Sequence, residues 1–244
     1  MTDDEHDLDD DDEPLVPPSA ERVARRALAL TAVVARSIVE RQASDAEAES
    51  FRAGLLAWTA RIGITDEIEP EELAVLQAPV GGLLPQQTIN ASWRAEGLAV
   101  LAWALGRYEL PRYDVEADGS EAAAALGFLR ELSETVLAAP SLRAPEELAA
   151  LREALFSLHW RLRNYGLDGL RMDFADFARR AWFGPLSLDG LRLMEGDLEV
   201  RGVPLFRAAE KDWHAARSIA RERQKAANWL EGQEALYSEV TCDT

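Results

Sequence analysis

Apolar residues recur every three or four positions along almost the whole chain after residue 18, which is the periodicity of amphipathic helices. The first such stripe consists of Val23, Ala27, Leu30, Val34 and Ile38. Further helices are predicted over residues 44–63, 70–76, 85–107, 120–138, from 145 onward, and 205–232. The pattern therefore predicts an all-α fold, a single multi-helix domain.

Several residue types mark where these helices begin. Ser19 stands where the first helix needs an N-cap, and Ser44 with Glu47 has the spacing of a capping box. Pro70 and Pro145 suit the first helical position, where a missing backbone N–H costs nothing. These signals support the helix boundaries that the periodicity predicts.

Residues 187–205 depart from the helical pattern because polar and apolar residues alternate there. Glu195, Gly196 and Asp197 supply a short loop, with Leu191 and Leu193 before it and Leu198 and Val200 after it. We predict one small β-hairpin near residues 187–205. A lone hairpin is marginal in water, so we expect it to lie against the helices.

The acidity of the chain is concentrated at its N-terminus. The formal net charge is −18, and residues 1–13 carry nine carboxylates with no lysine or arginine. Such a charge block buries little apolar surface, so we predict a disordered acidic tail over residues 1–18. The helical domain is then expected over 19–236, with a C-terminal tail over 237–244. The tail is interpreted as a solubilising extension, and the alternative is an arm that binds a basic partner or mimics nucleic acid.

Composition limits the classes of protein that fit. No apolar run approaches the ~20 residues of a membrane helix, and the acidic start is unlike a signal peptide. One cysteine and three histidines allow neither a disulfide framework nor a multi-histidine metal site, and no motif implies a cofactor. Arginine-rich and alanine-rich usage is typical of G+C-rich bacterial genomes. The sequence thus predicts a cytoplasmic bacterial protein that binds neither nucleic acid nor membrane.

Three polar side chains on different predicted helices face inward. Glu96 lies three residues after Trp93, His159 follows a leucine stripe, and Arg223 lies four after Ile219. Because isolated buried charges are very costly, we predict that Glu96 pairs with Arg223. His159 or Asn228 is expected to complete the hydrogen bonds, whereas Arg94 points elsewhere.

Two interpretations of this group stay open. A buried polar network that sets helix register is favoured over a pocket in which Glu96 is a general base and His159 an acid. Four tryptophans could line such a pocket, but large aromatics at helical spacing are more often core, and core is the prediction for Trp93, Trp103, Trp160 and Trp229.

Three segments carry a family resemblance. They are INASWRAEGLAVLAWAL at residues 89–105, LHWRLR at 158–163 and ERQKAANWL at 222–230. In this order they resemble the bacterial domain-of-unknown-function family 4272, over roughly residues 20–232. The resemblance implies a helical single domain and no named chemistry.

Two functional hypotheses follow. The first is a non-enzymatic binding or interaction protein, and the net charge of −18 suggests that it neutralises a basic partner. The alternative is a small-ligand-binding or hydrolase-like enzyme with a site around Glu96 and His159. The chain has no Gly-rich phosphate loop, nucleophile elbow or His-Glu-x-x-His motif, so an enzyme is the less favoured class.

Overall fold

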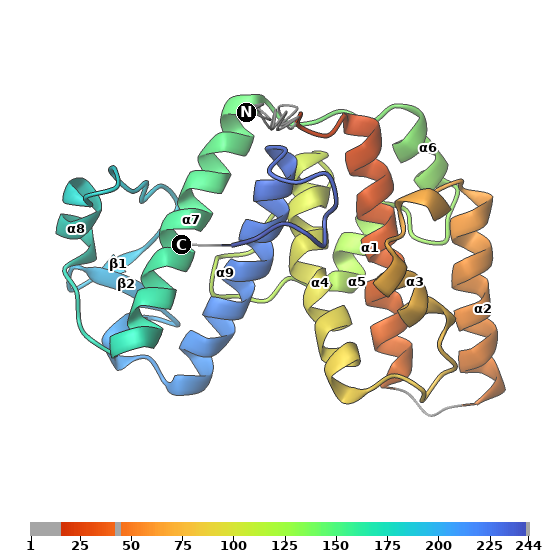
Figure 1. Cartoon of the computed structure of the whole chain (residues 1–244), viewed down its shortest axis with the longest axis horizontal. Coiled ribbons are helices and arrows are strands. Elements are labelled where there is room, and N and C mark those ends of the chain that lie inside the picture. Colours follow the sequence, from red (N-terminus) through yellow and green to blue (C-terminus); the bar gives the residue numbers. More distant parts are fainter. Residues whose placement is uncertain (1–15, 42–44, 243–244) are drawn as a thin grey trace, which may run out of the picture.

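The computed structural model describes residues 16–41 and 45–242. Most of the predicted acidic tail, the predicted capping residue Ser44 and the last two residues lie outside these ranges. Within them, two groups of elements lie on either side of a shared helix, α9 (Glu210–Leu230) (Figure 1). The all-α prediction is confirmed, with one small sheet as its β component.

The first group forms the larger core around a central helix. Its elements are α1 (Ala20–Glu40), α2 (Ala46–Arg61), a 3₁₀ turn (Thr65–Glu67), α3 (Pro70–Gln77), α4 (Pro85–Ala104), α5 (Gly119–Ala125) and α6 (Leu132–Ala138). Helix α1 packs mainly against α4, and Leu28 and Leu30 on it are completely buried. Its predicted stripe is buried as far as Val34, whereas Ile38 is 40% exposed.

The second group combines two helices with the sheet. Its elements are α7 (Pro145–Asp168), α8 (Phe174–Arg180), β1 (Leu193–Met194), β2 (Asp197–Val200), β3 (Val203–Pro204) and a 3₁₀ turn (Leu205–Arg207). All strand pairs are antiparallel, and Leu193 pairs with Leu198. The fully buried Arg161 of α7 donates two hydrogen bonds of 2.7 Å to Asp197, which fixes the sheet to that helix.

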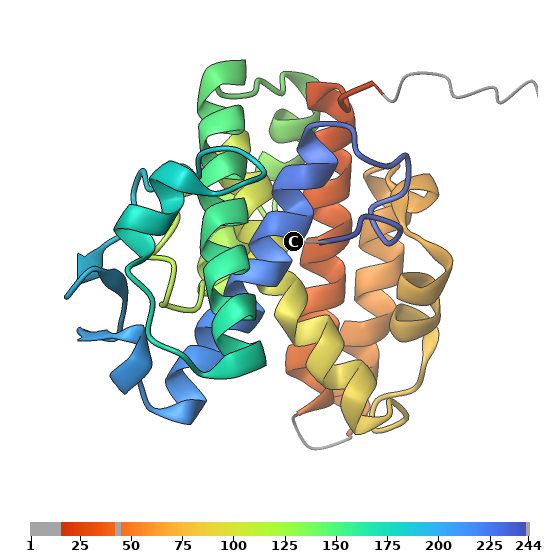
Figure 2. The same ribbon diagram turned by 60° about the vertical axis from the view of Figure 1, so that its left-hand side comes forward.

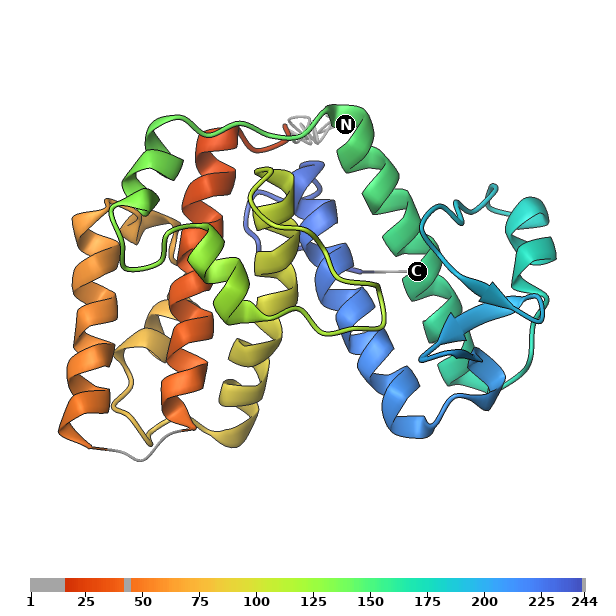
Figure 3. The same cartoon turned by 180° about the vertical axis from the view of Figure 1, so that it is seen from behind.

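Helix α9 joins the two cores. Trp229 packs in the first core, whereas Ala216 and Ala220 pack in the second. After α9 the chain turns back along the helices (dark blue in Figures 1 and 2). Although residues 237–244 are predicted as a tail, Tyr237 is 1% exposed and Val240 is 5% exposed. On the opposite side, the connection between α4 and α5 crosses toward α9 (Figure 3).

Local chemistry explains most helix starts. Ser19 Oγ accepts a hydrogen bond from the Arg22 N–H at 3.2 Å, which confirms its predicted capping role. Proline occupies the first turn of α3, α4 and α7, as predicted for Pro70 and Pro145. At the start of α2, Asp45 caps the helix through the Ala48 N–H at 2.8 Å.

Some predicted elements are wrong in extent. The helix expected over 120–138 is two short helices, because Gly127 and Leu129 adopt positive φ angles of 76° and 55° between them. The helix expected from residue 205 begins at Glu210, since a 3₁₀ turn first buries Leu205 in the second core.

The hairpin region also differs from its prediction. It is a three-stranded antiparallel sheet, in which Leu191 precedes β1 and Asp197 belongs to β2 rather than to the loop. Glu195 and Gly196 form the two-residue turn with φ angles of 53° and 82°. The sheet contacts α8 and α9, which confirms that it lies against helices.

Candidate functional site

The predicted Glu96–Arg223 pair is confirmed. Arg223 Nε donates to Glu96 Oε2 at 2.8 Å, and both side chains are at most 3% exposed. The second carboxylate oxygen accepts from the Ala117 N–H at 2.8 Å. Arg223 also donates to the carbonyls of Pro111 and Val115, both at 2.9 Å. The pair therefore ties α4, α9 and the α4–α5 connection together, and both oxygens of Glu96 are engaged.

Neither side chain expected to complete that network takes part in it. His159 Nδ1 lies 2.6 Å from Gln224 Oε1, an oxygen that only accepts, so the proton is on Nδ1. Asn228 Nδ2 donates instead to the Thr241 carbonyl at 3.1 Å. Their prediction as partners of Glu96 and Arg223 is wrong, because backbone groups already satisfy that pair.

His159 lines a cleft of about 750 Å³. The walls come from the first half of α4, from α7, from α9 and from residues 238–242 of the C-terminal segment. Five lining side chains are cationic and two are carboxylates, although acidic residues far outnumber basic ones in the whole chain. We call this feature the cationic cleft, and its cationic residues are Arg94, Arg163, Arg217, Arg221 and Lys225.

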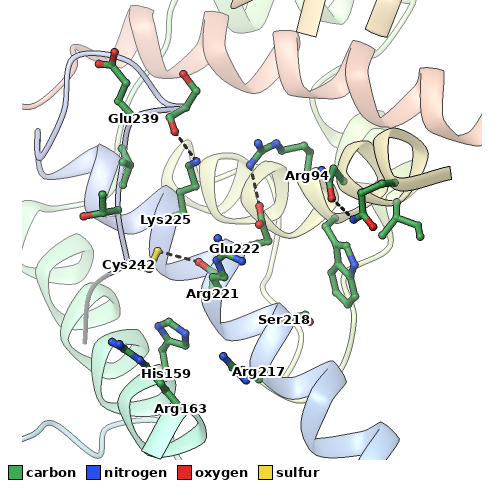
Figure 4. A pocket seen from close by; sticks show the side chains of 17 residues that line it. Arg94, His159, Arg163, Arg217, Ser218, Arg221, Glu222, Lys225, Glu239 and Cys242 are labelled. Atoms are coloured by element: carbon green, nitrogen blue, oxygen red, sulfur yellow. Dashed lines mark hydrogen bonds and ion pairs between the residues drawn. The ribbon is translucent and has the colours of Figure 1, made fainter. Parts of the chain in front are cut away.

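Two of these cations have structural tasks. Arg94 forms an ion pair with Glu222 across the cleft at 3.1 Å (Figure 4). Lys225 Nζ donates to the Ser238 carbonyl at 3.0 Å. Together with the Asn228–Thr241 hydrogen bond, this contact holds the C-terminal segment against α9. The C-terminal wall of the cleft is therefore attached to α9, the helix that carries three of the five cationic residues.

Arg217 and Arg221 differ from those two. Both are exposed on α9, and across residues 16–41 and 45–242 neither side chain makes a hydrogen bond or an ion pair. Figure 4 shows Arg217 grouped with His159 and Arg163 at one end of the cleft, below the Arg94–Glu222 pair. Two guanidinium groups with unused donors thus face the same cavity as a histidine.

The electrostatics of His159 reflect these neighbours. Burial lowers the pKa of His159 below its usual value, and the charges of Arg217, Arg163 and Arg221 lower this pKa further. The hydrogen bond to Gln224 acts on the pKa in the opposite direction. The ring is therefore neutral at pH 7, and its Nε2 makes no hydrogen bond to any residue that the structure describes.

Arg163, Arg217 and Arg221 were not among the site residues predicted from the sequence. Arg217, Arg221 and Lys225 follow one another at intervals of four residues, as do His159 and Arg163. Residues four apart share a helix face, so each helix carries a basic stripe. This spacing in a very acidic chain was the available signal.

Glu96 and His159 do not share a cavity in the described part of the chain. Glu96 lines a second cavity of about 500 Å³ with residues of α1 and of the α4–α5 connection. Trp93 lines both cavities. The hypothetical site around Glu96 and His159 is therefore divided into a structural ion pair and a separate cleft.

The four tryptophans predicted as core behave differently. Trp229 is completely buried, Trp103 packs against the first core, and Trp160 stacks on Phe177 with ring centroids 4.4 Å apart. Trp93 is half-buried and belongs to neither main core. Its core prediction is wrong because its helix face borders cavities rather than another element.

The described residues contain no cluster of three or more His, Cys, Asp or Glu side chains that could hold a metal ion. They also contain no helix that is both long enough and apolar enough to cross a membrane.

The fold and the cleft define a mostly helical protein with a ligand-sized cavity whose charge is opposite to that of the whole chain. A family model described as a domain of unknown function, DUF4272, matches residues 2–176, and the chain belongs to this family. The motif at 222–230 lies beyond the matched residues. No curated protein and no solved structure matches the chain.

Proposed function

We propose that this protein binds a small anionic ligand in the cationic cleft. The observation that carries the proposal is the pair Arg217 and Arg221, which face a cavity of about 750 Å³ without using their donors on the described residues. Guanidinium groups present a planar fork of donors that suits phosphate and carboxylate groups. A cavity of this volume is in the range of small-molecule sites.

From the sequence we considered a small-ligand-binding or hydrolase-like enzyme with a site around Glu96 and His159, and the proposal keeps its ligand binding. Glu96 has no catalytic task in it, because Arg223 and the Ala117 N–H occupy both carboxylate oxygens. Binding alone accounts for the cleft, so a non-enzymatic role remains our proposal. A bacterial cytoplasmic setting belongs to it and is supported by the single cysteine and the arginine-rich composition.

The net charge of −18 supports a separate proposal, an encounter with a basic protein. The same charge disfavours nucleic acid, because a phosphate backbone needs an extended basic surface. The cleft offers cationic groups to one small anion rather than to a polymer.

Calorimetric titration with inorganic phosphate and with sulfate tests the anion site. We expect saturable binding to the wild type and at least about fivefold weaker binding to Arg217→Gln and to Arg221→Gln, since each loses a charged hydrogen bond. Arg107→Gln is the matched control, because it removes the same charge from an exposed residue outside the cleft. Equal weakening in all three variants, or no anion binding by the wild type, would contradict the proposal.

A further inference from the structure

Trp93 has an unusual position among the seven tryptophans of the chain. Within the described residues, its ring stacks on no other aromatic ring and carries no cation over its face, and its indole N–H makes no hydrogen bond. It lies between the cationic cleft and the second cavity. A large half-buried indole that lines the cleft and stacks on no aromatic ring or cation of the described residues is available to a ligand.

The surroundings of Trp93 form an apolar and amide-lined wall. Ile89 lies one helical turn before it and is 45% exposed. Gln86 and Asn90 lie on the same side, and Gln86 Nε2 donates to Asn90 Oδ1 at 2.8 Å. That hydrogen bond leaves the Gln86 amide oxygen, the second Gln86 N–H and both Asn90 N–H groups for a ligand. The α4 wall of the cleft therefore suits a planar ring with polar edges.

The side of α9 that carries Arg217 and Arg221 lies close to this wall of α4. Arg94 follows Trp93 in the sequence, and its ion-pair partner Glu222 follows Arg221. The 3.1 Å contact between Arg94 and Glu222 therefore brings the Trp93 side of α4 next to the Arg221 side of α9. One ligand of moderate length can therefore contact both Trp93 and Arg221 inside a cavity of about 750 Å³.

We propose that the cleft binds a phosphorylated aromatic compound, such as a nucleoside monophosphate, with its phosphate at Arg217 and Arg221 and its ring stacked on Trp93. This inference rests on the proposed anion-binding function and adds the chemical class of the ligand. Stacking of a base on an aromatic side chain is sequence-tolerant and strong enough to change affinity measurably. The phosphate supplies the charge that the arginine side requires.

Titration with three probes tests the inference on the full chain. The probes are adenosine 5′-monophosphate, ribose 5-phosphate, which lacks the ring, and adenosine, which lacks the phosphate. We expect the nucleotide to bind about tenfold more tightly than ribose 5-phosphate, and adenosine to bind weakly. Trp93→Leu should abolish the advantage of the nucleotide and leave ribose 5-phosphate binding unchanged, whereas Trp93→Phe should keep most of it. Arg221→Gln should weaken both phosphates.

The outcomes separate the two proposals. Equal affinity for the nucleotide and ribose 5-phosphate in the wild type, a comparison that needs no variant, would overturn the ring contact and leave the anion site intact. The same conclusion would follow if Trp93→Leu, shown to be folded by its melting curve, weakened both phosphates equally. Adenosine binding as tightly as the nucleotide would overturn the phosphate contact. If no phosphate compound bound, the anion-binding function would fail with the inference.

Discussion

Buried arginines shape this protein at the scale of single residues. Arg26, Arg36, Arg161 and Arg223 are each at most 2% exposed, and each meets a carboxylate. An unpaired charge in such a place would be very costly, so the carboxylate and several backbone carbonyls share the guanidinium donors. Arg217 and Arg221 are the contrast, because both are exposed and their side chains make no hydrogen bond or ion pair with the described residues.

The first prediction concerns the Glu96–Arg223 pair. Glu96→Ala should lower the free energy of unfolding by about 3–5 kcal/mol, because it leaves the Arg223 guanidinium buried without its counter-charge. Glu96→Gln should cost less, since one acceptor and the side-chain shape remain. Denaturant unfolding measures both variants, and Glu116→Ala, an exposed carboxylate nearby, is the control. A Glu96→Ala protein as stable as the wild type would show that the pair is not structural.

The second prediction concerns His159 and pH. Because the folded protein holds the pKa of His159 below its usual value of about 6.5, an anion that binds beside the ring raises this pKa and promotes proton uptake. Sulfate affinity should therefore increase as the pH falls through about 6.5 and level off below the lowered pKa. Sulfate is the suitable probe because it keeps both negative charges between pH 5 and 8.

The measurement is calorimetric titration across that pH range. His159→Asn, which keeps a donor for Gln224 and cannot become charged, should lose most of the pH dependence. An increase of sulfate affinity with rising pH would refute the assigned role of the ring.

At the scale of elements, the sequence predicts helices well and their interruptions poorly. Proline at the starts of α3, α4 and α7 and Ser19 before α1 are local signals, so these boundaries were recoverable. Leu129 gives no local sign of its positive φ angle, and its conformation depends on how α6 turns back against α1. Helix α8 was missed because its seven residues are too few to establish a period.

The candidate site was also predictable only in part. The helical periodicity was enough to predict the Glu96–Arg223 pair, because both residues lie on the inner faces of long helices. The cleft depends on how α7 and α4 pack against α9, and the sequence contains no local record of that packing. Trp93 was therefore assigned to a core that its neighbours do not form.

The third prediction concerns the contact between α4 and the C-terminal segment. A Cβ atom at Gly97 would press on the hydroxyl of Tyr237, which is buried and has no hydrogen-bond partner in the described residues. Gly97→Ala should therefore destabilise the protein by about 1–3 kcal/mol. Tyr237→Phe removes the unsatisfied hydroxyl, so it should be neutral or stabilising alone and should rescue Gly97→Ala.

Thermal and denaturant unfolding of the two single variants and the double variant measure the coupling energy between Gly97→Ala and Tyr237→Phe. Gly54→Ala on α2 is the control, because nothing lies within 4 Å of its added Cβ, and it should stabilise the helix by up to ~1 kcal/mol. Additive effects of the Gly97 and Tyr237 changes would contradict the steric explanation.

At the scale of the whole molecule, the charge is segregated. The chain carries a net −18, whereas the cleft has three more cationic than acidic side chains among those that line it. Distant carboxylates repel an approaching anion at low ionic strength, when the Debye length is about 30 Å at 0.01 M. The local arginines act at contact distance and lose less of their attraction to salt.

The fourth prediction uses this difference. Replacing the nine carboxylates of residues 1–13 with amides halves the net charge to −9 without shortening the chain. Phosphate affinity should then rise about two- to fivefold at 0.01 M ionic strength and match the wild type at 0.15 M, where the Debye length is ~8 Å. Arg221→Gln should weaken phosphate binding at both salt concentrations. A basic protein partner would respond to the amide variant with the opposite sign, so titrations at two salt concentrations distinguish a small-anion site from recognition of a cationic protein by the acidic N-terminus.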